Sequence, residues 1–173
     1  MAKSVKIIFV LLFVVILVYL LTWNEIKSKS ELYYNYSVEF YENNEFEKAI
    51  KGHEQVIRNQ YVYFSGLQQI CTAWESPLSW PKPKVYSQAK EKLNDIIVDK
   101  MSIEERNSFI KKYFQIDKKY LAEMMLSIGD SYYERGELEK ALQTYEKVKE
   151  IFVHRKDAQN KADIAIAKIG KDK

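Results

Sequence analysis

Residues 125–152 read MLSIGDSYYERGELEKALQTYEKVKEIF, and this stretch decides the fold. It predicts two amphipathic helices joined by a tight turn, because Gly136 supplies the break that a helix end favours. The first helix carries an apolar stripe of Met125, Ile128, Gly129 and Tyr132. In the second helix, apolar residues recur at steps of three and four and therefore share one face. They are Leu138, Ala141, Leu142, Tyr145, Val148 and Phe152.

The same stretch resembles a tetratricopeptide repeat (TPR), a helix pair of about 34 residues with the pattern W-x2-L-G-x2-Y…A-x3-F…P. Met125 replaces the Trp, and Val153 stands near the usual Pro. The resemblance implies that the clearest repeat covers residues 122–155 and that further helices stack on it, since one pair cannot bury its stripe alone. The residues at the L, G, Y, A and F places are Ile128, Gly129, Tyr132, Ala141 and Tyr145.

Weaker versions of this pattern cover the preceding part of the chain. Residues 44–50 align with residues 136–142, so we expect a diverged repeat over residues 30–63, with His53 on the apolar face of its second helix. A degenerate middle pair follows over residues 61–100. A proline-rich loop at residues 75–84 interrupts this pair, because each Pro removes a backbone N–H and restrains its neighbour.

Two more helices complete the predicted map. Ser102 and Glu105 form a capping box that opens an extra helix over residues 102–115. Residues 157–171 combine Ala and Ile with many Lys, which is typical of the terminal cap of a solenoid. The predicted class is all-α: a single transmembrane helix, a linker at residues 24–30, and a short TPR-like solenoid of about eight helices over residues 31–173.

The first residues differ from the rest of the chain. Residues 7–23 carry no charge, and fourteen of them are Leu, Ile, Val or Phe. At 1.5 Å per residue they form roughly 25 Å of helix, close to the thickness of a bilayer's hydrocarbon core. The rival interpretation is a cleaved signal peptide, but the apolar run is longer than usual for one and no small-residue cleavage site follows. The prediction is an uncleaved transmembrane signal anchor at residues 1–23.

Charges around this segment favour one orientation. The amino terminus, Lys3 and Lys6 precede it, whereas Lys27 and Lys29 follow it among acidic residues. This balance favours a cytoplasmic N-terminus and an extracytoplasmic helical domain. The whole chain has a net charge of only +3 and no Lys/Arg block, so no nucleic-acid partner is expected.

No arrangement of side chains in the sequence predicts catalysis, a metal site or a cofactor. His53 and His154 lack Cys, Asp or Glu at ligand spacing. Cys71 lies on an apolar helical face and has no neighbouring His to activate it. The sequence therefore favours a protein that is not an enzyme.

The resemblance to TPR proteins implies a concave groove, lined by the first helix of each pair, that receives peptide segments. The hypothesis that follows is a membrane-anchored, non-catalytic scaffold that binds a protein or peptide, with another membrane or envelope protein as the partner. The alternative is an extracytoplasmic module that binds a glycan or small molecule through the aromatic-rich first half. Carried over by position, the groove residues are Tyr34, Val38, Tyr41 and Glu42 in the early pair, and Leu126, Asp130, Tyr133 and Glu134 in the late pair.

Overall fold

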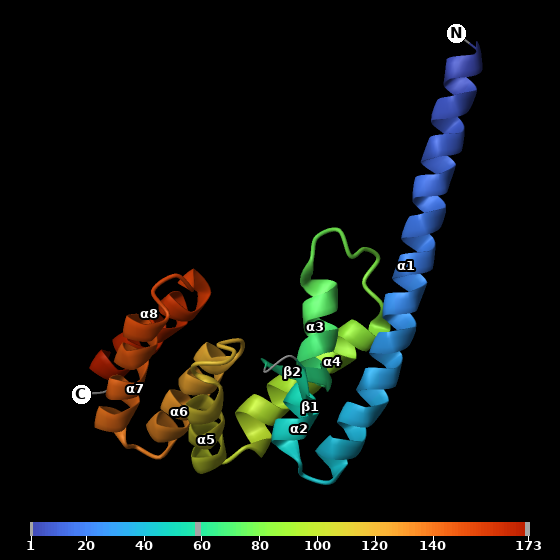
Figure 1. The fold of residues 1–173 in the computed structure, drawn as a ribbon. Coiled ribbons are helices and arrows are strands. Elements are labelled where there is room, and N and C mark those ends of the chain that lie inside the picture. Colours follow the sequence, from blue (N-terminus) through green and yellow to red (C-terminus); the bar gives the residue numbers. More distant parts are fainter. Residues whose placement is uncertain (1, 58–59, 172–173) are drawn as a thin grey trace. The chain divides into compact units, whose positions relative to one another are not determined.

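The computed structural model describes residues 2–57 and 60–171, and the chain forms two compact units, Met1–Leu93 and Asn94–Lys173. The described part is mostly helical, with eight α-helices, one π-helical turn and one two-stranded hairpin (Figure 1). The all-α prediction is thus confirmed at the level of class. The sequence predicted one helical domain over residues 31–173, whereas the structure divides that region near residue 93.

Helix α1 (Ala2–Glu42) is a single helix of 41 residues, so the predicted linker at residues 24–30 is wrong. This segment contains no Gly or Pro, and its charges pair one turn apart. The Lys29 ammonium donates to the Glu25 carboxylate at 2.6 Å, and Lys27 lies 3.3 Å from Glu31. Pairs with this spacing stabilise a helix, which explains why the chain does not break here.

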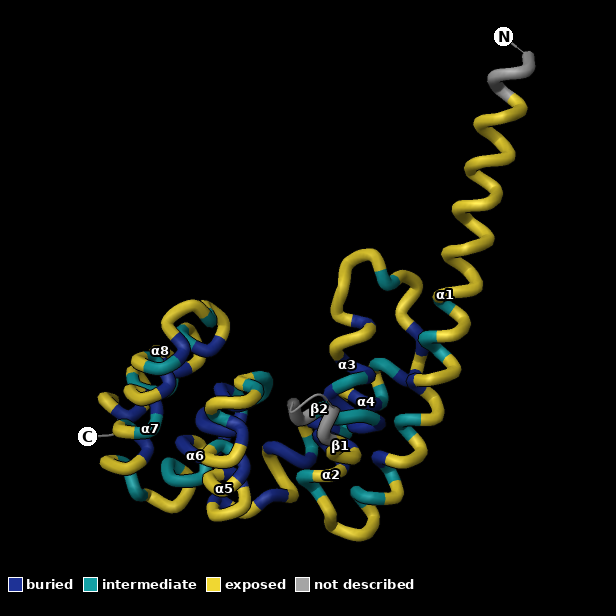
Figure 2. Tube along the Cα trace, in the orientation of Figure 1, coloured by how far each residue is buried: buried dark blue, intermediate teal, exposed yellow. Residues whose placement is uncertain are grey.

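The N-terminal part of α1 is the segment, among the described residues, that is long and apolar enough to cross a membrane. Its most apolar window has a mean hydropathy of 2.7. The large apolar side chains from Ile7 to Leu21 are 41–67% exposed, and Figure 2 shows this part of the helix exposed along its length. No other described element covers this apolar surface.

The C-terminal part of α1 packs against α3 (Leu67–Glu75) to make the core of the first unit. The buried Trp74 indole donates from Nε1 to Ser30 Oγ at 2.8 Å, and the ring of Trp23 meets the ring of Trp74 edge-on at 5.7 Å. Two turns beyond Ser30, the fully buried Ser37 Oγ lies 3.0 Å from the Ser65 carbonyl oxygen. Two small buried serines therefore allow the helix to approach its neighbours closely.

The second helix of the predicted diverged repeat is largely absent. Helix α2 (Phe46–Lys51) ends after six residues, and a hairpin of β1 (Gly52–Ile57) and β2 (Gln60–Ser65) follows. Gly52 has φ +78°, and a Cβ there would lie 1.7 Å from the Phe64 carbonyl oxygen. This backbone ends the helix, and the β-branched and aromatic residues that follow suit paired strands.

The hairpin corrects two further predictions. His53 is exposed on β1 instead of lying on a helical apolar face, and it pairs with Phe64 across the hairpin. The predicted helix over residues 61–74 begins only at Leu67. Residues 76–83, here named the proline loop, then connect α3 to α4 (Lys84–Asp95), which runs directly into the π-helical turn η1 (Ile96–Lys100).

The second unit stacks four helices after η1. The predicted capping box is confirmed: the Glu105 backbone N–H donates to Ser102 Oγ at 3.1 Å, and the Ser102 N–H donates to the Glu105 carboxylate at 2.7 Å. Neighbouring helices pack in chain order, and the last helix contacts both of the two before it. The four are α5 (Ile103–Tyr113), α6 (Leu121–Glu134), α7 (Leu138–Ile151) and α8 (Lys156–Lys171).

Helices α6 and α7 cross closely at the two small residues Gly129 and Ala141. Ala141 is fully buried, and a Cβ added at Gly129 would lie 2.4 Å from the ring of Tyr145. That ring is itself buried, and its hydroxyl donates to the Asp130 carboxylate at 2.6 Å. Burial, followed by this hydrogen bond to a carboxylate, raises the pKa of Tyr145 well above its usual value.

Candidate functional site

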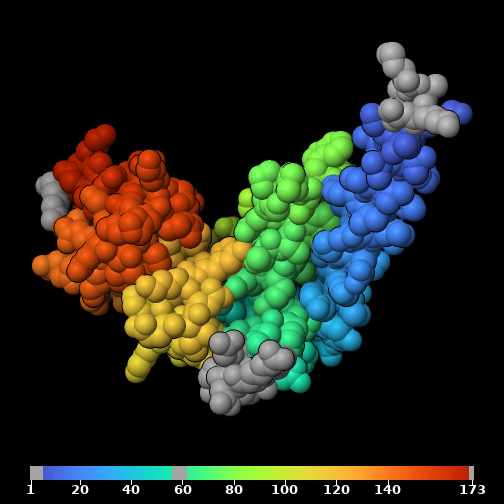
Figure 3. Space-filling model, turned by 45° about the horizontal axis from the view of Figure 1, so that its top comes forward, coloured from blue at the N-terminus to red at the C-terminus, as the bar shows by residue number. Residues whose placement is uncertain are grey.

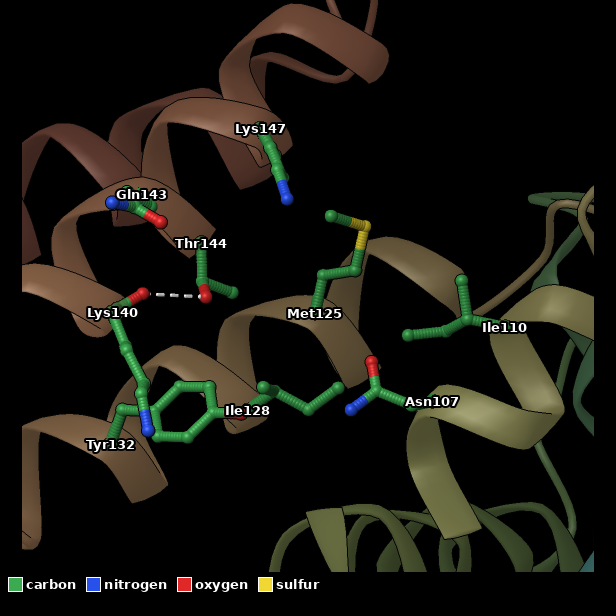
Figure 4. Close-up of a pocket in the computed structure, with 9 residues that line it drawn as sticks. All are labelled: Asn107, Ile110, Met125, Ile128, Tyr132, Lys140, Gln143, Thr144 and Lys147. Carbon is green, nitrogen blue, oxygen red and sulfur yellow. Dashed lines mark hydrogen bonds between the residues drawn. The ribbon is translucent and has the colours of Figure 1, made fainter. Parts of the chain in front are cut away.

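The second unit contains an open cavity of about 470 Å³ between α5, α6 and α7 (Figure 4). This volume lies within the range of about 300–1,000 Å³ that is usual for binding pockets. The wall residues come from all three helices, and none of them is acidic. They are Asn107, Ile110, Met125, Ile128, Tyr132, Lys140, Gln143, Thr144 and Lys147. This space is named here the α5–α7 groove.

The floor of the α5–α7 groove is apolar. Met125, Ile128 and Tyr132 project from one face of α6, since they are spaced three, four and seven residues apart. Met125 and Ile128 are buried, whereas Tyr132 and the neighbouring Ile110 of α5 are half-buried. These three α6 residues belong to the stripe that the sequence predicted as the packing face of the helix pair. The structure covers that stripe with α7 only in part.

The wall formed by α7 is polar and positively charged. Lys140, Gln143, Thr144 and Lys147 share one face of the helix at steps of three and four. The Lys140 ammonium lies 5.4 Å from the centre of the Tyr132 ring and is paired with Glu137. Lys147 is exposed and makes no ion pair with any residue in 2–57 or 60–171.

A buried guanidinium holds α5 in place beside α6. Arg106 is only 4% exposed; it donates to the hydroxyl of Ser127 and, at 3.2 Å, to that of Ser131. The Ser127 hydroxyl in turn donates to the Ile97 carbonyl oxygen at 3.1 Å. Burial lowers the pKa of Arg106, and nearby Arg135 adds to this effect. Because these bonds are enclosed, the wall that α5 contributes is fixed before any ligand arrives.

The predicted groove residues of the late pair lie on a different face of α6. Leu126 is buried, and Asp130 accepts the hydrogen bond from Tyr145. The Tyr133 ring is half-buried beneath α8, with the Lys168 ammonium 4.3 Å from its centre. Glu134 is exposed near the end of the helix. None of these four residues lines the α5–α7 groove.

The predicted groove residues of the early pair lie on α1, in the first unit. Tyr34, Val38 and Tyr41 are half-buried, and Glu42 is exposed. The Tyr41 ring lies 6.0 Å from the Phe46 ring and 3.7 Å from the Lys92 ammonium. Each predicted set therefore shares one helix, but the two sets belong to separate units.

The sequence reasoning missed the residues of the α5–α7 groove. One available signal was the pair Lys140 and Lys147, seven residues apart on α7, with Gln143 and Thr144 between them on the same face. The position of α5 was not available, because it depends on the Arg106 hydrogen bonds between helices that are separated in sequence.

The aromatic side chains of the first half pack largely against one another. The His53 ring meets the rings of Phe40 and Tyr36 edge-on, at 5.1 Å and 6.5 Å. Cys71 is buried in α3. Within residues 2–57 and 60–171, no three His, Cys, Asp or Glu side chains are grouped so that they could hold a metal ion.

Comparison of the chain with protein-family models, with curated proteins and with solved structures found no match.

Proposed function

We propose that this protein is a membrane-anchored, non-catalytic scaffold whose α5–α7 groove binds an acidic amphipathic segment of a partner protein. The helix pair α6–α7 serves as a TPR-like unit in this proposal, and α1 serves as the anchor with its N-terminus in the cytoplasm. Another membrane or envelope protein is the expected partner, because both chains would then be confined to one membrane. The observation that carries the proposal is the combination of an apolar floor and an exposed cation on the α7 wall, Lys147, which makes no ion pair with any described residue.

The floor provides an apolar contact for the partner in this account. Its accessible surface comes mainly from the half-buried Tyr132 and Ile110, since Met125 and Ile128 are buried, and each square ångström of apolar surface removed from water contributes roughly 25 cal/mol. An amphipathic helix supplies such side chains at spacings of three and four residues, which matches the spacing along α6. The floor therefore suits one face of a helical segment.

The α7 wall provides selectivity for charge. Lys147 is exposed, so a single ion pair with a partner carboxylate contributes only about 0.2–1 kcal/mol. Lys140 is already paired with Glu137, so the unpaired Lys147 carries the preference: a basic segment would meet repulsion there, whereas an acidic one would meet attraction. Membrane confinement raises the effective concentration of both partners, so that modest affinity is sufficient.

The test uses the full chain in lipid nanodiscs and two designed amphipathic peptides as probes. Both peptides carry the same Leu face, and one presents Glu where the other presents Lys. Fluorescence anisotropy measures the dissociation constant of each. We expect the acidic peptide to bind about tenfold more tightly than the basic one, a difference of about 1.4 kcal/mol.

Two variants connect the binding to the α5–α7 groove. Thr144→Trp fills the space beside the apolar floor and is expected to weaken binding of the acidic peptide at least tenfold. Lys161→Trp adds the same side chain on exposed α8, away from the nine lining residues, and is expected to leave binding unchanged. Equal binding of both peptides, together with no response to Thr144→Trp, would show that this groove is not the binding surface.

A further inference from the structure

The proline loop (residues 76–83) is hydrogen-bonded to α1 at the end of its apolar segment. The Tyr19 hydroxyl lies 3.2 Å from the Leu78 carbonyl oxygen and also contacts the Trp80 carbonyl oxygen. One turn further along α1, the Trp23 indole donates from Nε1 to the Pro81 carbonyl oxygen at 2.9 Å. In Figures 1 and 3, the part of the chain around this loop lies beside α1. All of these residues belong to the first unit.

Among the described side chains of this unit outside α1, the proline loop carries the most exposed large apolar ones. Leu78 is 83% exposed and Trp80 is 72% exposed. They extend the apolar surface that α1 presents up to Leu21, which is 63% exposed. Tyr19 lies about 6 Å along the helix axis before Trp23. The level at which the loop meets α1 is therefore within the apolar segment and not beyond it.

The backbone of the proline loop is suited to a medium with little water. Pro77, Pro81 and Pro83 have no N–H to satisfy. Three of the remaining amides are bonded inside the loop. The N–H of Leu78 donates to Ser76 Oγ at 3.3 Å, that of Ser79 to the Ser76 carbonyl at 3.1 Å, and that of Trp80 to the Leu78 carbonyl at 3.0 Å.

Several carbonyl groups of the loop have partners as well. The Pro81 carbonyl accepts from the Trp23 indole, and the Leu78 carbonyl accepts from the Trp80 N–H. The Tyr19 hydroxyl, with one proton to donate, contacts the carbonyls of Leu78 and Trp80. A backbone polar group without a partner is costly in the lipid environment, which is why irregular segments there need internal partners. Trp is also favoured at the boundary between headgroups and acyl chains. The loop therefore combines exposed apolar side chains with several hydrogen-bonded backbone groups, as suits a segment at this boundary.

We propose that the proline loop is a second membrane contact: it enters the headgroup–acyl boundary of the leaflet from which the first unit emerges, with Leu78 and Trp80 in the lipid. This inference rests on the proposed anchoring role of α1. With two contacts instead of one, the first unit has a fixed tilt and rotation relative to the bilayer. A single helix alone would leave that rotation free.

The test measures the immersion depth of nitroxide labels on the full chain in nanodiscs of mixed zwitterionic and anionic phospholipid. Labels are placed on Leu78→Cys and Trp80→Cys in the loop, on Leu12→Cys in the apolar segment, and on Lys90→Cys, an exposed position on α4. Because Cys71 is buried, the unaltered chain serves as the labelling blank. Collision rates with oxygen, which concentrates in lipid, and with a water-soluble nickel chelate report the depth of each label.

We expect the Leu12 label to be deep in lipid and the Lys90 label to be in water. The Leu78 and Trp80 labels should collide several-fold less with the nickel chelate than the Lys90 label does. If Leu12 is deep while both loop labels are as accessible to nickel as Lys90, the loop inference is overturned and the anchor stands. If Leu12 itself is accessible to nickel, the anchor and the loop inference both fail. Normal helicity by circular dichroism confirms that each labelled chain is folded.

Discussion

Replacing Gly129 by Ala tests the crossing of α6 and α7 directly. The added Cβ would lie 2.4, 2.8 and 2.9 Å from three ring carbons of Tyr145, whereas carbon atoms in normal contact are about 3.5–4.0 Å apart. Tyr145 is only 2% exposed, and its hydroxyl is bonded to the Asp130 carboxylate at 2.6 Å. The ring therefore has no free space to enter and cannot turn away without losing that bond.

The expected loss of stability depends on whether the Tyr145 ring stays in place or moves away. If the ring stays, overpacking costs about 1–3 kcal/mol. If the ring moves, loss of a hydrogen bond to a charged group costs about 1.5–3 kcal/mol. Ala is better than Gly inside a helix by about 1 kcal/mol, which offsets part of either cost. The net destabilisation is then about 0–2 kcal/mol if the ring stays and about 0.5–2 kcal/mol if it moves. For a unit of this size each kcal/mol lowers the Tm by about 4–8 °C.

Hydrogen exchange of the α6 and α7 amides measures the stability of this unit in the intact chain. The matched control is Gly170→Ala in α8, where an added Cβ meets nothing within 4 Å. The control should be neutral or slightly stabilising, while Gly129→Ala should accelerate exchange throughout α6 and α7. If the two Ala variants have the same effect, the helices do not cross as closely as described.

Three further predictions concern the interactions that hold each unit together. Ser127→Ala removes one hydrogen-bond acceptor of the buried Arg106 guanidinium and the hydroxyl that donates to the Ile97 carbonyl. We expect the free energy of unfolding, measured by chemical denaturation, to fall by about 2–3 kcal/mol. Adding Arg106→Met should restore part of this loss, and additive losses in the double variant would contradict an energetic coupling between Ser127 and Arg106. Asp157 accepts two hydrogen bonds from Arg155, which hold its pKa at about 2, below the usual range for an aspartate. The stabilisation of the fold by this pair is therefore present above about pH 4 and is lost as the pH falls through 2. Because Asp157 is exposed, this stabilisation is below about 1 kcal/mol. Asp157→Asn should make the Tm fall less steeply as the pH is lowered from 4 to 2. If the Tm falls as steeply as in the wild type, the Asp157–Arg155 pair does not contribute to stability. Gly52→Ala places a Cβ against the Phe64 carbonyl at a residue with a positive φ. It should therefore lower the Tm of the first unit by several degrees. An unchanged Tm would contradict the close approach of Gly52 to Phe64 at the start of the hairpin.

The sequence predicted the parts of the fold that depend on local spacing. The packing faces of α6 and α7 lie within 28 consecutive residues. On α6 this face includes Ile128 and Gly129. The helical period of 3.6 residues identifies both faces from the sequence alone. The capping box at Ser102 and Glu105 is local in the same way, and it is confirmed. These interactions are decided within one helix or one helix pair.

Other features were not predictable from local patterns. The run from Phe46 to Val56 fits a helical period, but α2 ends at Lys51. From Gly52, with its positive φ, the chain continues as a hairpin, whose residues also suit a strand. The bond from Tyr19 to the proline loop joins residues about 60 positions apart. The α5–α7 groove was missed for a similar reason, because it exists only once Arg106 has fixed α5 beside α6.

Reversing the charge of the α7 wall tests directly whether the partner binds in the α5–α7 groove. Lys140→Glu combined with Lys147→Glu reverses the charge of the α7 wall while leaving its apolar floor unchanged. With the full chain in nanodiscs, anisotropy titrations compare the acidic and basic peptides on the wild-type and reversed proteins. The account predicts that the preference inverts, so that the reversed protein binds the basic peptide more tightly. If the reversed protein still prefers the acidic peptide by the same factor, the α5–α7 groove is not where the partner binds.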